Sequence, residues 1–243
     1  MSDNIVIKIN NVYKDFQLGI FNFKSLVNKK KFENNKLEAL KNINIEINKS
    51  DRIGIIGKNG SGKSTLLKII SRVTYPTKGN VEIYGKVSSA LEAGTGFNQE
   101  LTGYDNIFLN GAILGINYYV IKSKIDDIIK FSDLESYINT PVKRYSTGMI
   151  VRLAFSIIAY LEGDIMILDE ILSVADEEFR IKCIKKIMND SQINNRTLLF
   201  VSHDIRNIKE TCNKVLYLRG GEVQFFGNVM NGINLYNQAT SSN

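Results

Sequence analysis

Hydrophobic residues recur at every second position in two segments near the start of the chain. Isoleucine occupies alternate positions within residues 5–9 and again within residues 43–47, and polar residues fill most of the positions between. A period of two places the isoleucines on one face of an extended backbone. Both segments are therefore predicted to be strands with one face in water and the other against a core.

Other segments are apolar without alternation, or change to a helical period. Runs at 53–56 and 165–168, and the run 197–201 after its initial Thr197, are apolar without alternation, which is typical of short strands buried on both faces. Residues 64–73 and much of 101–161 instead space their apolar residues three or four apart, as a helix does. Residues 215–226 predict a hairpin that turns at Gly220-Gly221. The pattern as a whole predicts a strand-rich α/β core interrupted by a helical insertion.

Composition adds size and compartment to this picture. The 243 residues suffice for one large domain, or for a core with a small subdomain, and 44% hydrophobic with 23% charged residues indicates a globular protein. The net charge of +6 suits polyphosphate ligands or an anionic membrane surface, and ordinary solubility accounts for it equally well.

The sequence also predicts a cytoplasmic location and no membrane span of its own. Its longest apolar stretch, 149–161, is broken by Arg152 and Ser156, and residues 1–14 lack the apolar core of a signal peptide. Cys183, Cys212 and His203 are too few for a zinc cluster, and a disulfide framework is not expected.

Residues 17–36 form a polar, basic segment that includes Lys29, Lys30 and Lys31. One interpretation is a solvated surface loop. The other is a basic element that lies near lipid headgroups or a membrane partner.

The clearest chemical motif is a glycine-rich loop between a buried strand and a helix. Residues 57–64 read G-K-N-G-S-G-K-S and fit the phosphate-binding pattern G-x-x-x-x-G-K-[ST]. Glycines let successive backbone N–H groups face phosphate oxygens, and the helix N-terminus adds positive potential. Lys63 is expected to reach the β- and γ-phosphates, and Ser64 to bind Mg²⁺. Residues 48–51 also match N-K-x-D, the guanine-recognition pattern of GTPases. GTPases carry that pattern well after the phosphate loop, and here it precedes the loop, which argues against a GTPase.

Two later apolar strands end in polar residues that suit nucleotide hydrolysis. Asp169 and Glu170 follow 165–168: Asp169 is expected to hold Mg²⁺ through water, and Glu170 to orient or deprotonate the attacking water. For an isolated Asp-Glu pair, a charge at a helix N-terminus is the alternative interpretation. His203 follows 197–201 on the same predicted sheet edge and is interpreted as a polar contact to the γ-phosphate.

A second candidate anion-binding terminus precedes the apolar helix at 150–161. Residues 145–149, Tyr-Ser-Thr-Gly-Met, place Ser and Gly at the helix start. One nucleotide needs only one such terminus, so the second could face the nucleotide of another subunit. The alternative is that Ser146 simply caps the helix.

Taken in this order, the motifs resemble those of the ABC ATPase superfamily over nearly the whole chain. The phosphate loop matches Walker A, Asp169-Glu170 matches Walker B with its catalytic glutamate, and His203 resembles the switch histidine. Residues 173–176, ending in Asp176, resemble the D-loop, and Phe16 resembles the aromatic residue that stacks on adenine. The Walker A residues are Gly57, Lys58, Asn59, Gly60, Ser61, Gly62, Lys63, Ser64 and Thr65, and the residues similar to the signature motif are Tyr145, Ser146, Thr147, Gly148 and Met149.

Departures from the general pattern resemble one branch, the ATPase subunits that export O-antigen, capsule and teichoic acid. The branch-like features are the Y-S-T-G-M signature, residues 92–107, residues 169–183 and the long segment between Phe16 and Leu40. By spacing, Glu92 stands at about the position of the family's Q-loop glutamine and is the candidate for a further Mg²⁺ contact there.

The resemblance implies a fold, a ligand set and partners. The expected fold is a RecA-like P-loop core of ABC type with an N-terminal antiparallel β-subdomain (residues 1–96 and 162–243) and an inserted helical subdomain (97–161) that carries the signature. ATP and Mg²⁺ are the expected cofactors. Two copies are expected to form a head-to-tail homodimer that sandwiches two ATP molecules between Walker A of one subunit and residues 146–148 of the other.

The implied function is ATP-driven export of a lipid-linked surface polysaccharide through an integral membrane permease, at the cytoplasmic face of the membrane. The chain ends near Asn243 without room for a carbohydrate-binding domain, so the glycan is expected to be contacted mainly by the membrane subunit. The alternative within the family is another cargo, such as a drug, lipid or peptide. A non-transport ABC ATPase acting on DNA or the ribosome is disfavoured, since no long coiled-coil insertion or second ATPase domain is present, and no nucleic-acid partner is expected.

Overall fold

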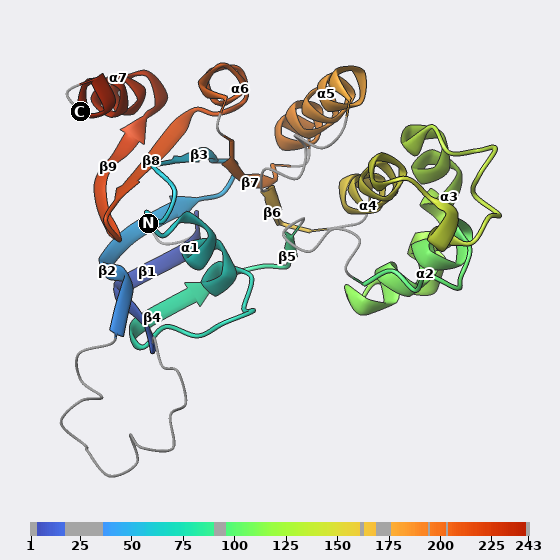
Figure 1. Ribbon diagram of the computed structural model, residues 1–243, viewed down its shortest axis with the longest axis horizontal. Coiled ribbons are helices and arrows are strands. Elements are labelled where there is room, and N and C mark those ends of the chain that lie inside the picture. Colours follow the sequence, from blue (N-terminus) through green and yellow to red (C-terminus); the bar gives the residue numbers. More distant parts are fainter. Residues whose placement is uncertain are drawn as a thin grey trace, which may run out of the picture. The chain divides into compact units, whose positions relative to one another are not determined.

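The computed structural model describes residues 4–17, 36–89, 96–160, 163–168, 176–193, 195–202 and 204–241 (Figure 1). The strands are β1 (Ile5–Gln17), β2 (Lys36–Asn48), β3 (Arg52–Ile56), β4 (Lys78–Ile83), β5 (Val87–Ser89), β6 (Ile165–Leu168), β7 (Thr197–Val201), β8 (Lys214–Arg219) and β9 (Glu222–Asn228). The helices are α1 (Lys63–Ile70), α2 (Gly103–Ile113), α3 (Tyr118–Ser132), α4 (Thr147–Tyr160), α5 (Glu177–Ile193), α6 (Ile205–Thr211) and α7 (Val229–Ser241), with a 3-10 turn, η3 (Val142–Arg144).

The chain divides into two compact units that alternate along the sequence. Unit 1 comprises Met1–Ile47, Ile55–Tyr84 and Lys214–Asn243, and unit 2 comprises Asn48–Gly54 and Gly85–Asn213. Strand β3 is shared, because its beginning belongs to unit 2 and its end to unit 1.

The first sheet of unit 1 has the order β2-β1-β4, with β1 antiparallel to β4. Ile43, Ile45 and Ile47 are buried while the residues between them are exposed. Both predicted strands are therefore present, and the wet face is confirmed for β2, whereas in β1 Val6 is buried as well as Ile7 and Ile9. The third strand, β4, lacks a clear apolar alternation and is specified by its partner, since Ile7 pairs with Ile83 and Ile9 with Val81.

The rest of unit 1 is the end of β3, the hairpin β8–β9, and helices α1 and α7. The hairpin turns at Gly220 and Gly221, whose φ values of 59° and 84° lie in the left-handed region that glycine adopts without strain, so the predicted turn is confirmed. Helix α7, red in Figure 1, packs on the hairpin through Gly232, where a Cβ atom would lie 2.1 Å from a methyl of Val215.

Unit 2 contains a parallel sheet built from the buried runs. Its strands are hydrogen-bonded in the order β5-β6-β7, followed by the beginning of β3. Ile165 pairs with Val87 on one side and with Thr197 on the other, and Leu168 pairs with Phe200. The carboxyl ends of β6 and β7 therefore lie at one edge of the sheet, and their amino ends at the opposite edge.

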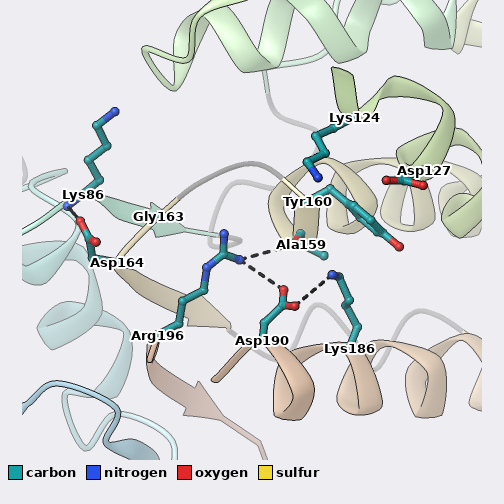
Figure 2. Close-up of a pocket in the computed structure, with 10 residues that line it drawn as sticks. All are labelled: Lys86, Lys124, Asp127, Ala159, Tyr160, Gly163, Asp164, Lys186, Asp190 and Arg196. Atoms are coloured by element: carbon teal, nitrogen blue, oxygen red, sulfur yellow. Dashed lines mark hydrogen bonds and ion pairs between the residues drawn. The ribbon is translucent and has the colours of Figure 1, made fainter. Parts of the chain in front are cut away.

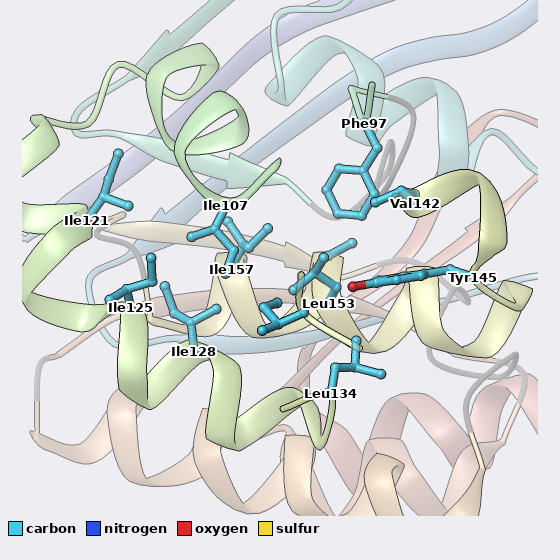
Figure 3. Close-up of a cluster of buried hydrophobic side chains, with 12 residues drawn as sticks. Phe97, Ile107, Ile121, Ile125, Ile128, Leu134, Val142, Tyr145, Leu153 and Ile157 are labelled. Atoms are coloured by element: carbon cyan, nitrogen blue, oxygen red, sulfur yellow. The ribbon is translucent and has the colours of Figure 1, made fainter. Parts of the chain in front are cut away.

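The helices of unit 2 bury a core of their own (Figure 3). Ile107 of α2, Ile128 of α3 and Leu153 of α4 are all 0% exposed. Along each of these helices the buried residues recur at helical spacing, so the helical period of residues 101–161 is confirmed. Helix α2 begins with a capping box in which Thr102 and Asp105 bond each other's backbone N–H.

The apolar run within 149–161 forms helix α4, and its breaks have structural reasons. The Ser156 hydroxyl is buried and donates to the carbonyl oxygen of Arg152 at 2.7 Å, while Arg152 reaches outward to carboxylates. Among the described residues, no helix is long and apolar enough to cross a bilayer.

Candidate functional site

The glycine-rich loop joins the buried end of β3 to helix α1, all within unit 1. Gly57 has φ 152°, and a Cβ there would lie 2.3 Å from the carbonyl oxygen of Leu218. Gly62 has φ 101°, and a Cβ there would lie 2.6 Å from the carbonyl oxygen of Ala39. Both positions require glycine on two counts, backbone conformation and space. The tip of the loop, Lys58-Asn59-Gly60, is exposed.

The loop closes on itself through the side chain of Lys63. The ammonium group of Lys63 donates to the carbonyl oxygens of Gly57 at 2.8 Å and of Lys58 at 3.2 Å. The residue is 8% exposed, so a positive charge is held beneath the loop. Such a charge attracts an anion to the concave side of the loop.

The start of α1 offers further donors. Gly62 provides no side-chain cap, so the first N–H groups of the helix are not satisfied by a capping side chain. Ser61 is 4% exposed, and its hydroxyl oxygen has no hydrogen-bond partner among the described residues. An orphaned buried hydroxyl beside uncapped amides and a buried lysine fits a phosphate group. In the first turn of α1, Ser64 is exposed and Thr65 is half-buried.

Phe16, the candidate adenine contact, also lies in unit 1. It is 40% exposed near the end of β1, and the ammonium of Lys14 lies 5.1 Å from its ring centroid. The ring is therefore accessible, with a cation–π contact to Lys14.

The signature-like segment lies in unit 2, where it leads from η3 into α4. Tyr145 is 8% exposed, and its hydroxyl donates to the carbonyl oxygen of Tyr137 at 2.8 Å. Burial raises the pKa of Tyr145, so its hydroxyl stays a protonated donor at neutral pH. A Cβ at Gly103 would lie 2.2 Å from this hydroxyl oxygen, so the tyrosine occupies space that only glycine leaves open.

The residues after Tyr145 present backbone toward solvent. Ser146 and Thr147 are exposed, and a Cβ at Gly148 would meet nothing closer than 3.9 Å. The Ser146 hydroxyl oxygen accepts the N–H of Met149 at 3.2 Å, so Ser146 caps helix α4.

Asp176 immediately precedes helix α5 and is tied to helix α4. Its carboxylate accepts from the Phe179 N–H at 2.9 Å and from both Nε and Nη2 of Arg152, the former at 3.2 Å. These hydrogen bonds, led by those from Arg152, hold the pKa of Asp176 below its usual value. Arg152 also bonds Asp133, at the end of α3, at 3.3 Å.

Arg152 is a contact that sequence reasoning missed. Its only signal in the sequence is a single cation inside the apolar run 149–161. Pairing with Asp133 and Asp176 depends on how three helices meet, and spacing along one helix does not give that.

Several predicted site residues lie outside the described residues. They are Glu92, Asp169, Glu170, Ser173, Val174, Ala175 and His203. The strands that precede two of these positions are described: β6 ends at Leu168 and β7 at Val201, as neighbours in the parallel sheet.

The fold and the loop together define the class of the protein. A buried strand, a glycine loop with a buried lysine, and a helix with an open N-terminus make a nucleoside-triphosphate-binding P-loop protein. The family model described as ABC transporter matches residues 40–173, and the chain belongs to this family, whose members bind ATP as ATPase subunits.

The chain is similar to ATP-binding proteins of two export systems. It is 40% identical over 204 residues to the O-antigen export system ATP-binding protein RfbB of Klebsiella pneumoniae, covering 84% of this chain and 82% of that protein. It is 38% identical over 239 residues to the teichoic acids export ATP-binding protein TagH of Staphylococcus haemolyticus, covering 97% and 89%. TagH of Lactococcus lactis is 46% identical, but the match spans 43% of its length.

Solved structures confirm the fold. A structure titled ATP binding subunit of ABC transporter superposes with a TM-score of 0.79 at 17% identity, covering 96% of this chain and 93% of that one. A dimeric bacterial ABC transporter cassette gives 0.77 at 22% identity, covering 92% and 98%. The α/β fold of ABC type, with an antiparallel N-terminal sheet and a helical part, was thus predicted correctly.

Proposed function

We propose that this chain is the ATP-hydrolysing subunit of an ABC exporter that moves a lipid-linked surface polysaccharide, such as O-antigen or teichoic acid, across the cytoplasmic membrane. The assignment of the cargo rests on the similarity to O-antigen and teichoic acid export proteins over most of the chain. The observation that supports ATP hydrolysis is the phosphate loop, with its buried Lys63 and the Ser61 hydroxyl that has no partner among the described residues.

In this proposal the phosphate loop holds the triphosphate. Lys63 lies under the loop and neutralises phosphate charge, while the N–H groups of residues 57–65 donate to phosphate oxygens. Ser64, exposed at the start of α1, binds Mg²⁺ together with Asp169, and Glu92 is the further candidate. Bound ATP and Mg²⁺ supply the phosphoryl group and the charge neutralisation that its transfer to water requires.

Glu170 and His203 are assigned to hydrolysis. Each follows a buried strand whose end lies at the same sheet edge, β6 for Glu170 and β7 for His203. Glu170 orients or deprotonates the attacking water, and His203 contacts the γ-phosphate. Phe16, accessible at the end of β1, stacks on the adenine.

The proposed partners follow from the exposed start of helix α4. Residues 146–148 of the signature-like segment face the nucleotide of a second subunit in a head-to-tail homodimer, and Asp176 of the D-loop lies at that interface. Within each subunit, residues 97–161 act as the helical subdomain. The dimer lies at the cytoplasmic face of the membrane on an integral permease, which makes most contacts with the glycan.

The deciding experiment replaces the proposed catalytic base in the native cell. A Glu170→Gln subunit binds ATP without the carboxylate needed to activate water, so export is expected to stop. Surface glycan and lipid-linked glycan retained inside are measured together. Loss outside with accumulation inside supports glycan export. Normal surface glycan, with the variant expressed and bound to ATP, would redirect the proposal to another cargo.

A further inference from the structure

A cavity of about 700 Å³ lies within unit 2, at the amino ends of its parallel strands (Figure 2). Lys86 immediately precedes β5, Asp164 immediately precedes β6, and Arg196 immediately precedes β7. The positions proposed for hydrolysis follow the carboxyl ends of β6 and β7, the opposite edge of the same sheet. No residue of the phosphate loop lines the cavity.

Four cationic and three acidic side chains line the cavity. Of the cations, Lys86 and Arg196 precede strands, and Lys124 and Lys186 lie on helices α3 and α5. Figure 2 shows the side-chain nitrogens of Lys124, Lys186 and Arg196 directed toward one region, while Lys86 extends away at the far rim. Arg196 is the most enclosed of the three, with 13% of its side chain exposed.

Two of the three carboxylates of the wall, Asp190 and Asp164, are engaged, and the third, Asp127, is exposed on α3. Asp190 accepts from Lys186 at 3.0 Å and from Arg196 at 3.4 Å. Asp164 accepts the backbone N–H of Lys86 at 2.7 Å, which fixes the turn into β6. Over the part of the chain that the structure describes, no group of three or more acidic, histidine or cysteine side chains is placed to hold a metal ion.

Donors, by contrast, remain available. The ammonium of Lys124 forms no hydrogen bond or ion pair with another described residue. An ammonium carries three protons, so Lys186 keeps donor capacity beyond its bond to Asp190. The Lys186 ammonium also lies 4.2 Å from the ring centroid of Tyr160, which fixes it against an aromatic wall.

We propose that this cavity binds a phosphate-bearing small molecule, with Lys124, Lys186 and Arg196 holding the phosphate. The nitrogens of these three side chains point toward one region of the cavity, and the Lys124 ammonium has no bonded partner among the described residues, so a phosphate there gains charge-assisted hydrogen bonds. The volume lies in the range of small-molecule sites and exceeds what a lone phosphate fills. A phosphorylated sugar has the required combination of anionic group and body. The site is independent of the phosphate loop and of the proposed cargo.

Calorimetric titration of glucose 1-phosphate into the full-length chain, already saturated with ADP, tests the proposal. Saturable binding is expected. Lys124→Gln should weaken it about tenfold, since a charge-assisted bond to phosphate is lost. Lys124 is exposed, so its replacement leaves the core intact. Lys122→Gln, also exposed on α3 but outside the cavity lining, is the matched control and should bind as the wild type does.

The same titration with inorganic phosphate and with glucose separates the sources of affinity. Weaker binding of inorganic phosphate and none of glucose supports a phosphorylated molecule. Equal, Lys124-dependent binding of inorganic phosphate would overturn that identity and assign the cavity to the free ion. Absence of saturable binding of both phosphates, or equal affinities of the Lys124→Gln and wild-type chains, would overturn the site.

Discussion

At the scale of single residues, Tyr145 shows how one side chain anchors the signature-like segment to the helical core of unit 2. The hydroxyl of this buried tyrosine donates to the Tyr137 carbonyl, in the space left by Gly103. Tyr145→Phe leaves that carbonyl oxygen without its donor and is expected to lower the free energy of unfolding by about 1–2 kcal/mol. Urea denaturation measures the change.

Tyr137→Phe is the matched control. The side chain of Tyr137 is 54% exposed, and only its backbone carbonyl takes part in the bond, so this change should alter stability by less than about 0.5 kcal/mol. Equal stability of Tyr145→Phe and wild type would show that the hydroxyl bond does not anchor the segment.

At the scale of elements, a set of ion pairs joins the helices of unit 2. Arg152 of α4 bonds Asp133 at the end of α3 and Asp176 at the start of α5, and Lys182 of α5 bonds Asp133 at 2.7 Å. Arg152 also lies 5.1 Å from the ring centroid of Phe179. This set of ion pairs, called the clamp below, therefore fixes the start of α5 relative to α4, the helix that follows the signature segment.

The clamp predicts a pH dependence with a defined sign. Because the folded-state pKa of Asp176 is lowered, chiefly by Arg152, its contribution to stability is present above the unfolded pKa of about 3.9. It is lost as pH falls through the folded pKa. Arg152→Gln is thus expected to destabilise the protein at pH 7 by up to about 1 kcal/mol, since the carboxylate is partly exposed, and by less at pH 3.

Denaturant unfolding at both pH values measures this difference, and NMR titration of Asp176 should show its pKa rising in the variant. Arg144→Gln removes an exposed cation just before the signature segment and should leave both quantities unchanged. A destabilisation by Arg152→Gln that is equal at the two pH values would show that packing on Phe179, and not charge, accounts for the effect.

At the scale of the whole molecule, the proposed homodimer is tested by association. With ATP and Mg²⁺, Glu170→Gln is expected to give particles of about twice the monomer mass of 27.4 kDa, because ATP that is not hydrolysed keeps the two subunits together. Light scattering measures the mass. Glu178→Gln changes an exposed glutamate of α5 and should behave as the wild type does. A Glu170→Gln chain that stays monomeric and hydrolyses ATP normally would contradict both the dimer and the role of Glu170.

The sequence by itself determined the elements whose signal is local. Alternating isoleucines specified β1 and β2, apolar runs specified β3, β6 and β7, and glycines with a lysine specified the phosphate loop. These features are readable because backbone geometry fixes the side-chain period, and because left-handed φ values such as those of Gly62 and Gly221 favour glycine. The class of the protein follows from them.

Only the tertiary structure decided features that join distant segments. Strand β4 is defined by pairing with β1, helix α1 ends at Ile70 and not at Val73 because the chain turns at Arg72 with φ 61°, and Arg152 finds its two aspartates on other helices. The cavity at the amino ends of β5, β6 and β7 gathers side chains more than a hundred residues apart. Such contacts depend on register and packing, which a linear pattern does not contain.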